Sequence, residues 1–534
     1  MRLRPATDAT GRRTPARGGR PGFVILAVLI VIVILALAAY RFTDLMTAEY
    51  RAAARSQDAA QARLAARSGV HYAAAMLSDP ATLAGELGGN PYADGSFSAQ
   101  TVRPGDNPRM EARFVLVAVL PDGGGGYEQR YGCVVDESGK LNVNALIQAD
   151  PSGQVLYDSL MKLPNMTTDV ADAIVDWVDP DDDPRDGGAE SDHYLGLGQP
   201  YRAKNGPLNS LDELLLVRGV TPQVLFGNDR NRNGVADDDP GGGSLDRGLA
   251  DYLTVYGRDL NVDSQGQLRT NVNEADDLPG LYQKLLARLP PELADFIMAY
   301  KLFSVQSGST ARQTGSTAAT VAGGAAELKT AVEATLGTLP VNRRRITNFL
   351  DLVTARVTLP AVPGAPAGTP RIVVQSPLAD PAAFAQLFPE LMDKATTTTN
   401  VELPPRVNLS TAPREVLLAI PGGAAESGLT EEEADAIIAQ RDSLDPTAPA
   451  TVTGAWVLTG DTPAVSQATF RRIAKYVTGR TMVYRVQAVG YFARGGPVAR
   501  VEAVIDTNQG APRILYFRDL TDLDTPRGFE PPRE

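Results

Sequence analysis

An uncharged apolar run from Phe23 to Tyr40 is the feature that most limits how this 534-residue chain can fold. The run is about 18 residues long, close to the ~20 residues that a helix needs to cross a bilayer. The 22 residues before it carry six arginines and one aspartate. Because clustered positive charge stays in the cytoplasm, we expect one membrane helix with its N-terminus inside and the bulk of the chain outside.

A glycine followed directly by an aromatic residue, Gly22-Phe23, joins the basic segment to the apolar run. Glycine lets an extended backbone enter a protease at the membrane face without an obstructing side chain. A secretory signal peptide is the alternative, because the alanines before Tyr40 suit its cleavage site. The order of basic leader, Gly-Phe junction and apolar helix resembles a type IV prepilin. This resemblance implies cleavage after Gly22 by a prepilin peptidase and N-methylation of Phe23.

The helical pattern continues beyond the apolar run and ends at Asp79-Pro80. Mostly small residues fall on one stripe at helical spacing. The stripe consists of Ala52, Ala59, Ala62, Ala66, Gly69, Ala73 and Leu77. A helix face made of such small side chains can pack closely on a sheet or on copies of itself. An ordinary amphipathic helix has the same spacing and is the alternative interpretation.

A pattern recurs three times in the middle of the chain, and each copy predicts two helices joined by a tight turn. The copies begin at Asn142, Asn271 and Asn408, and each has a Leu-Pro or Ile-Pro break before a segment containing Ala-Asp. We expect the Asn, Ser and Thr positions to cap the first helix of each copy. Thr430–Glu433 and Ser210–Glu213 have the form of capping boxes.

These helix pairs resemble helix-hairpin-helix units, whose best-known use is to hold a DNA phosphate against hairpin amides. A membrane-anchored DNA receptor of the competence type, which has such units, is therefore an alternative function. The formal charge of −12 becomes −17 once the first 22 residues, with a charge of +5, are removed. Because DNA binding depends on cations at the phosphates, this charge argues against a nucleic-acid partner and favours divalent cations as ligands.

Ala27 stands at the fifth position after the expected cut, where pilins normally carry glutamate. In the pilin family that carboxylate pairs with the N-terminal amine of the subunit above, and a tip subunit has none above it. An unpaired carboxylate in hydrocarbon would cost ~2.5–3.5 kcal/mol. The chain thus resembles the K-type minor pseudopilin of type II secretion systems. The resemblance covers roughly residues 20–225 and 400–507. The segments that match the family in this part of the chain are Val175–Asp179, Gly187–Glu190, Pro207–Val220 and Val407-Asn408.

The resemblance implies an α+β fold, in which a type IV pilin-like long N-terminal helix packs on a small antiparallel sheet with a large inserted α-helical domain. It implies a structural subunit at the tip of a periplasmic pseudopilus, which helps initiate assembly and export folded proteins. The implied partners are other minor pseudopilins, the major pseudopilin, prepilin peptidase and the inner membrane, which the chain crosses once. A minor pilin of a type IV pilus is a further alternative.

The expected segments follow from these features. They are a basic leader (1–22), a transmembrane helix (23–40), its periplasmic extension (41–79), the first part of the sheet (80–140), a helical insertion with acidic loops (141–303), a low-complexity linker with additional inserted region (304–400), the last helix-hairpin-helix-like unit (401–480), a C-terminal hairpin completing the sheet (481–518) and a loose tail (519–534).

Two acidic segments are candidates for a structural Ca²⁺ site. In the first, Asp229, Asn231, Asn233 and Asp237 occupy positions 1, 3, 5 and 9 of a loop with glycine at position 6. The carbonyl of Val235 would supply position 7, as in calcium-binding loops. Position 12 is proline, so the loop fails as an EF-hand, and Asp238 or Asp239 could substitute for its terminal glutamate.

The second candidate is a denser group of carboxylates, and a polar surface turn is its alternative interpretation. Its residues are Asp179, Asp181, Asp183, Asp186 and Glu190. K-type relatives bind calcium in this domain, so the resemblance implies the same ligand here.

Alternation of apolar and polar residues over 484–492 and 498–505, around a glycine-rich turn, predicts a β-hairpin. Phe114–Leu120 and Tyr131–Val135 can complete its sheet, which makes the helical region an insertion between paired strands. The single cysteine, Cys133, is expected to be a small buried hydrophobe.

Stretches rich in Gly, Ser, Thr, Ala or Pro, at 304–327 and 360–370, predict flexible linkers or long loops. The two histidines, His71 and His193, are far apart, and the sequence has no catalytic triad or phosphate loop at usable spacing. We therefore expect a structural role and no enzyme activity.

Overall fold

The structure is a computed structural model of the chain, which divides into two compact units, residues 1–61 and 62–534. It describes residues 21–88, 90–92, 95–105, 107, 110–121, 127–237, 245–306, 320–322, 324–336, 344–361, 366, 369–422, 428–508 and 510–523. The basic leader up to residue 20, together with Asp238 and Asp239, lies outside these residues.

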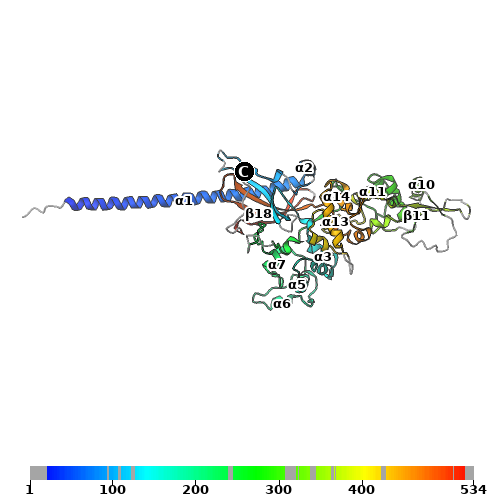
Figure 1. Ribbon diagram of the computed structural model, residues 1–534, viewed down its shortest axis with the longest axis horizontal. Coiled ribbons are helices and arrows are strands. Elements are labelled where there is room, and N and C mark those ends of the chain that lie inside the picture. Colours follow the sequence, from blue (N-terminus) through cyan, green and yellow to red (C-terminus); the bar gives the residue numbers. More distant parts are fainter. Residues whose placement is uncertain are drawn as a thin grey trace, which may run out of the picture. The chain divides into compact units, whose positions relative to one another are not determined.

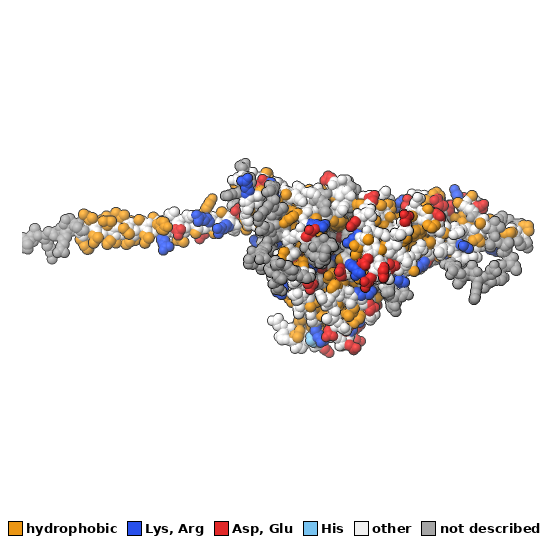
Figure 2. All heavy atoms as spheres, in the orientation of Figure 1, with side chains coloured by type: hydrophobic (Ala, Val, Ile, Leu, Met, Phe, Trp, Pro, Cys, Tyr) orange, Lys and Arg blue, Asp and Glu red, His pale blue; other side chains and the backbone are white. Residues whose placement is uncertain are grey.

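The first unit contains the N-terminal part of helix α1 (Pro21–Ser78). Within the described residues, one helix is long and apolar enough to cross a membrane, and it begins at Phe23. The apolar side chains of this segment are exposed along its length, as Figure 2 shows by its continuous hydrophobic colouring. A segment of this composition is stable in lipid, where every backbone group is satisfied inside the helix.

An antiparallel sheet is the centre of the pilin-like part of the second unit. Its strand order is β1-β2-β17-β18-β19, and β3 pairs with β2 while β4 pairs with β17. The strands are β1 (Gln100–Arg103), β2 (Ala112–Pro121), β3 (Tyr127–Tyr131), β4 (Val135–Asp136), β17 (Val483–Phe492), β18 (Ala499–Asp506) and β19 (Arg513–Asp519). The expected hairpin is thus confirmed as β17 and β18, in register from Val483↔Asp506 to Gly490↔Ala499.

The second half of α1 packs on this sheet through the part of the small-residue stripe from Ala62 to Leu77, whereas Ala52 is exposed and Ala59 is half-buried. Ala66 and Ala73 are fully buried in a core that includes Phe114 of β2. Glycine is required at Gly490 of β17, because a Cβ there would lie 2.0 Å from the carbonyl oxygen of Ala62. The small side chains therefore let helix and sheet approach closely, and the expected α+β pilin-like fold is confirmed. Cys133 is buried beside this sheet, as expected.

The helical region is an insertion in the sheet. β2 and β4 precede residue 137 and pair with β17, which begins at residue 483. The elements between them include η2 (Glu137–Gly139), α3 (Val143–Ala149), α4 (Gln154–Leu160), α5 (Thr168–Val178), α6 (Ser191–Leu195), η3 (Leu211–Leu216), α7 (Pro222–Phe226), α8 (Leu278–Leu286), α9 (Pro291–Leu302), α10 (Ala325–Leu336), α11 (Pro381–Lys394), α12 (Arg414–Ala419), α13 (Glu431–Arg441), α14 (Pro449–Thr453) and α15 (Gln467–Ile473). Of these, α5, α6 and α7 lie together, apart from α10 and α11 (Figure 1).

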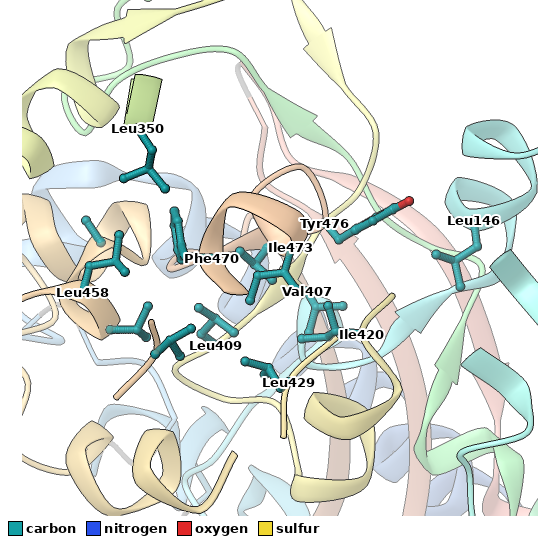
Figure 3. Packing of buried hydrophobic residues seen from close by; sticks show 14 of the residues in the cluster. Leu146, Leu350, Val407, Leu409, Ile420, Leu429, Leu458, Phe470, Ile473 and Tyr476 are labelled. Atoms are coloured by element: carbon teal, nitrogen blue, oxygen red, sulfur yellow. The ribbon is translucent and has the colours of Figure 1, made fainter. Parts of the chain in front are cut away.

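Each of the three sequence copies contains a pair of helices in contact: α4 with α5, α8 with α9, and α12 with α13. The first copy has an additional helix, α3, before its pair. The three copies share one continuous apolar core, in which Leu409, Leu458 and Phe470 lie close to one another although they are far apart in the sequence (Figure 3). Burial of such side chains is the main stabilising contribution to a helical domain, at roughly 1.5–3 kcal/mol each.

Asn142, Asn271 and Asn408 each end a two-residue strand, a feature that the sequence pattern did not indicate. β5 (Leu141–Asn142) pairs with β6 (Leu253–Thr254), β8 (Thr270–Asn271) with β13 (Ala395–Thr396), and β15 (Val407–Asn408) with β16 (Val477–Thr478), all in parallel. Asn142 also caps α3, because its Oδ1 accepts a hydrogen bond from the Ala145 amide (2.9 Å). Asn271 and Asn408 accept instead from the amide two residues later. The expected cap is therefore wrong in two copies, where the asparagine forms a local turn.

One of the two expected capping boxes is present. The Glu433 amide donates to Thr430 Oγ1, and the Thr430 amide donates to the Glu433 carboxylate, both at 3.2 Å. The prediction at Ser210 is wrong, because η3 follows it and Ser210 supplies no side-chain cap. The Glu213 carboxylate instead accepts a hydrogen bond from Lys204 Nζ (2.7 Å), which is a stronger, charge-assisted partner.

The first stretch expected to be a linker, 304–327, contains regular structure, whereas the described residues of the second, 360–370, lie outside helices and strands. A four-stranded sheet in the order β10-β12-β11-β9 lies between residues 304 and 375. Its strands are β9 (Ser304–Gln306), β10 (Thr320–Ala322), β11 (Arg356–Thr358) and β12 (Arg371–Gln375). Strands of three to five residues carry weak sequence signals, and pairing with distant partners decides their structure.

A buried ion-pair network joins the insertion to the sheet. Arg485 of β17 donates from Nε and Nη2 to the Glu137 carboxylate (2.8 and 2.7 Å) and from Nη1 to Glu502 of β18 (3.0 Å). Glu502 also pairs with Arg232. Burial opposes ionisation of Glu137, but Arg485 lowers the pKa of this carboxyl to about 2. The pair is therefore charged and specifies how the two parts meet.

Candidate metal centre

The loop between α5 and α6 is fixed at both ends by buried aromatic residues. The Trp177 and Tyr194 rings pack edge to face with centroids 5.2 Å apart, and Tyr201 stacks on Tyr194 at 5.2 Å. Asp179 ends α5, and Glu190 directly precedes α6. The aromatic cluster therefore determines where the two carboxylates lie.

Two other carboxylates of α5 hold the loop against the helix. Asp172 Oδ2 accepts a hydrogen bond from the Gly187 amide (3.1 Å), and Asp176 Oδ2 accepts one from the Arg185 amide (3.1 Å). Gly188 allows this approach, because a Cβ there would lie 1.9 Å from Asp176 Oδ2. Hydrogen bonds and the absence of a side chain thus position the loop.

Asp179, Asp181 and Glu190 come together at the centre of this arrangement. One oxygen from each lies within 4.8 Å of the oxygens of the other two. Asp179 and Glu190 are each only 4% exposed, whereas Asp181 is exposed. Within the described part of the chain, both carboxylate oxygens of Glu190 and Oδ1 of Asp179 are buried without a hydrogen-bond partner.

Burial raises the pKa of Asp179 to about 7 and that of Glu190 to about 8. Repulsion from Asp181 and Asp176 adds to the shift at Asp179, and repulsion from Asp176 adds to it at Glu190. Unpaired buried carboxylates are costly unless a cation or a proton neutralises them. Their oxygens are the ligands that Ca²⁺ prefers, so the cluster fits a divalent cation.

The rest of the second candidate set lies outside this cluster. Asp183 is exposed, and its amide donates to Asp181 Oδ1 (3.0 Å). Asp186 is also exposed. The loop folds back through Arg185, whose guanidinium donates to the Ser152 carbonyl (2.6 Å), and sequence spacing gives no sign of this contact.

The Asp229 loop, the first candidate, curls around Gly234, whose φ is +80°. Asp229 Oδ1 accepts from the Asn233 amide and Oδ2 from the Gly234 amide, both at 2.9 Å. Asn231 Oδ1 also accepts from the Asn233 amide (3.0 Å), and Asp237 Oδ2 accepts from the Arg230 amide (3.0 Å). The alternating oxygens thus bind the loop's own backbone.

Cations already surround this loop. Buried Arg500 of β18 donates to the carbonyls of Asn231 and Arg232, and Arg232 pairs with Glu502. Burial raises the pKa of Asp229, while hydrogen bonds from the loop amides oppose the rise. The side chains fit a cation less well here than at Asp179, because their oxygens have donors. Val235, the expected carbonyl ligand, lies in the same turn, and its amide donates to Asn233 Oδ1 (2.8 Å).

The expected processing site lies at the start of α1. Gly22 is in the first turn of the helix, and the Phe23 side chain is 72% exposed. The Phe23 side chain is therefore accessible at one end of an apolar helix, and cleavage and methylation stay predictions.

Comparison with known families identifies the segment that contains the three carboxylates. Residues 139–226 match the family model of type II secretion system (T2SS) protein K. The predicted resemblance to K-type minor pseudopilins is thereby confirmed for this segment, which runs from η2 to α7 and includes the whole α5–α6 loop. The Asp229 loop begins three residues after the matched segment.

Comparison with curated proteins gives no match to the chain. Among solved structures, the chain is similar to a chain in the crystal structure of the GspK-GspI-GspJ complex from the type 2 secretion system of enterotoxigenic Escherichia coli. The two are 12% identical, and the similarity covers 87% of this chain and 97% of that chain with a TM-score of 0.36. A TM-score of this size does not establish a shared arrangement of parts.

Proposed function

We propose that the chain is a structural minor pseudopilin of a type II secretion system. The match of residues 139–226 to the protein K family is the observation that carries the proposal. The apolar helix supports it, because a pseudopilin needs a membrane anchor before assembly. In this proposal the N-terminus lies in the cytoplasm, α1 crosses the inner membrane, and the second unit lies in the periplasm.

The tip of the pseudopilus is the proposed position in the assembly. Ala27 supports it, since a subunit with none above it gains nothing from a carboxylate in the apolar helix. The proposed partners are the other minor pseudopilins and the major pseudopilin below, with prepilin peptidase acting earlier on Gly22-Phe23. The subunit would initiate assembly and help to export folded proteins across the outer membrane without catalysing a reaction.

Calcium has a structural role in this proposal. Asp179, Asp181 and Glu190 would hold the ion, with the Asp229 loop as a second, weaker site. The bound ion would supply positive charge that neutralises the buried carboxylates. The α5–α6 loop would then keep its hydrogen bonds to Asp172 and Asp176 without electrostatic repulsion.

A deletion and complementation experiment in the source bacterium tests the secretory role. We expect loss of the gene to abolish export of the proteins secreted by the type II pathway, and the wild-type gene to restore it. Gly22→Glu should not restore export, because the charged side chain blocks processing, whereas the control Ala39→Val, within the same helix, should. Normal export in the deletion strain would refute the proposal.

A further inference from the structure

A cleft of about 510 Å³ in the helical insertion has a composition that neither the metal centre nor the anchor explains. Its basic lining residues are Arg269, Arg406, Arg471, Arg472 and Lys475, and none of the described residues that line it is Asp or Glu. The whole chain has more acidic than basic residues, 63 against 51. The lining of this cleft is therefore locally basic in an acidic chain, although Arg406 and Arg471 pair with carboxylates that lie outside the lining.

The cations surround an apolar lining. Leu146, Phe388, Met392 and Leu403 are among the lining residues, and Tyr476 directs its hydroxyl toward Leu146 (Figure 3). Ligand sites typically have 300–1,000 Å³ of space with apolar walls and a few polar anchors, and this cleft matches that description. It suits a ligand that carries both an apolar side chain and negative charge.

Two of the arginines that line the cleft pair with carboxylates outside it. Arg406 pairs with Asp259, and Arg471 pairs with Asp351. Arg269 donates from Nε to the Asp393 carbonyl (2.9 Å), and no carboxylate among the described residues lies within ion-pair distance of it. Burial, and then Arg406 and Arg480, lower the pKa of Arg269 to about 9, although Asp259 and Asp393 oppose part of this shift. An anion in the cleft would relieve this repulsion.

Exposed Lys475 is a second cation available to a ligand. Its Nζ lies 4.6 Å from the centroid of the Tyr476 ring, at the cleft wall. Such a contact leaves the ammonium open to solvent or to a carboxylate.

A second basic pocket, of about 390 Å³, lies beside the same chain segment. Lys301, Arg344 and Arg345 line it, and none of its described lining residues is acidic. Thr397 lines both pockets, and its carbonyl accepts a hydrogen bond from Asn273 (2.9 Å). Two basic pockets that share Thr397 suit a ligand with negative charges spaced along a chain.

We propose that this pair of pockets binds an acidic peptide segment, in which aspartate or glutamate alternates with large apolar residues. The apolar side chains would enter the larger cleft, and the carboxylates would meet the surrounding cations. A peptide is favoured over nucleic acid because the charge of −17 outside the leader repels a polyphosphate backbone far more than a few carboxylates. The site is independent of the proposed role in secretion.

Fluorescence anisotropy with the full-length chain in detergent tests the site. The probe is a fluorescein-labelled octapeptide that alternates Asp or Glu with Leu or Phe. We expect saturable binding that weakens as salt screens the charges. A peptide with Asn and Gln in place of the acids, and one with Gly in place of the apolar residues, should each bind at least tenfold more weakly.

Charge reversal at exposed positions locates the binding. Lys475→Glu combined with Arg345→Glu should weaken the acidic probe about tenfold, since each reversal replaces an attraction with a repulsion. Arg371→Glu is the matched control, because Arg371 is exposed and lines neither pocket, and it should change the affinity less than twofold. Circular dichroism verifies that all variants fold.

Three results would overturn the proposal. The first is equal binding of the acidic probe to the double variant and to the Arg371→Glu control. The second is equal binding of the uncharged peptide. The third is tighter binding of single-stranded DNA than of the peptide at the same site, which would assign the pockets to nucleic acid.

Discussion

Replacing Glu190 with glutamine should convert the proposed metal centre into a neutral polar site. The side chain keeps its size and loses its charge, while Asp179 and Asp181 remain in place. In the wild type, the Glu190 oxygens are buried without partners and close to two other carboxylates. Without metal, the variant therefore removes a negative charge that repels Asp179 and Asp181. With metal, it removes one of the three carboxylate ligands.

The sign of the effect follows from the pKa. The pKa of Glu190 is raised from 4.5 to about 8 by burial and by neighbouring carboxylates. A carboxyl whose pKa rises on folding destabilises the folded state progressively as pH increases from the unfolded pKa to the folded pKa. A pKa difference of one between the folded and unfolded states corresponds to ~1.4 kcal/mol of stability. Solvent near the exposed Asp181 screens part of this electrostatic contribution. We expect Glu190→Gln to be about 1–2 kcal/mol more stable than wild type at pH 8 in chelator, and equal to it near pH 4.5.

Calcium should reverse this order. A ligand that binds only the folded state stabilises it by RT ln(1 + [L]/Kd), which is ~2.7 kcal/mol at a hundredfold excess over Kd. Wild type should therefore melt higher in calcium than in chelator, and Glu190→Gln should lose most of that rise. Magnesium should have a smaller effect, because it is smaller and gives up water reluctantly.

Thermal unfolding of the full-length chain in detergent, followed by circular dichroism, measures these differences. Asp183→Asn is the matched control, because Asp183 lies in the same loop, is exposed, and is outside the three-residue cluster. It should behave as wild type. Identical melting of wild type and Glu190→Gln in chelator at pH 8, with the same rise in calcium, would refute the metal centre.

Three further predictions concern other parts of the chain. Replacing Asp229 and Asp237 together with alanine should remove the calcium-induced rise in melting that survives in Glu190→Gln, and an unchanged rise would show that the loop is only an acidic turn. The full-length chain should not bind duplex or single-stranded DNA at physiological salt, whereas micromolar, salt-sensitive binding in a titration would favour a competence-type receptor. Arg485→Met should lower the free energy of unfolding in urea by ~3–5 kcal/mol, because it leaves Glu137 buried and unpaired, and a loss below 1 kcal/mol would contradict the network.

The parts of the fold that follow a regular period were predictable from sequence. The small-residue stripe of α1 and the alternation in β17 and β18 determine which faces are buried, and those faces meet in the structure. β19 was missed, although Arg513–Asp519 pairs with β18 along its length. Its side chains are mostly exposed, so it lacks the buried alternation that marks a strand.

The carboxylate cluster shows where spacing stops being informative. Loop spacing favoured Asp229 and its alternating partners, yet backbone amides of the same loop occupy those oxygens. The Asp179 group has no regular spacing, and its oxygens meet because Asp172 and Asp176 hold the loop back on α5. Any residue of a loop can donate a hydrogen bond from its backbone amide. The residue types therefore give little indication of contacts that hold a loop through its backbone.

Mass spectrometry of the mature N-terminus, on protein purified from the source bacterium, tests the central claim most directly. A pseudopilin should begin at Phe23, with a methyl group on its new amine and the basic leader removed after Gly22. An intact Met1, or a start downstream of Tyr40, would contradict the assignment.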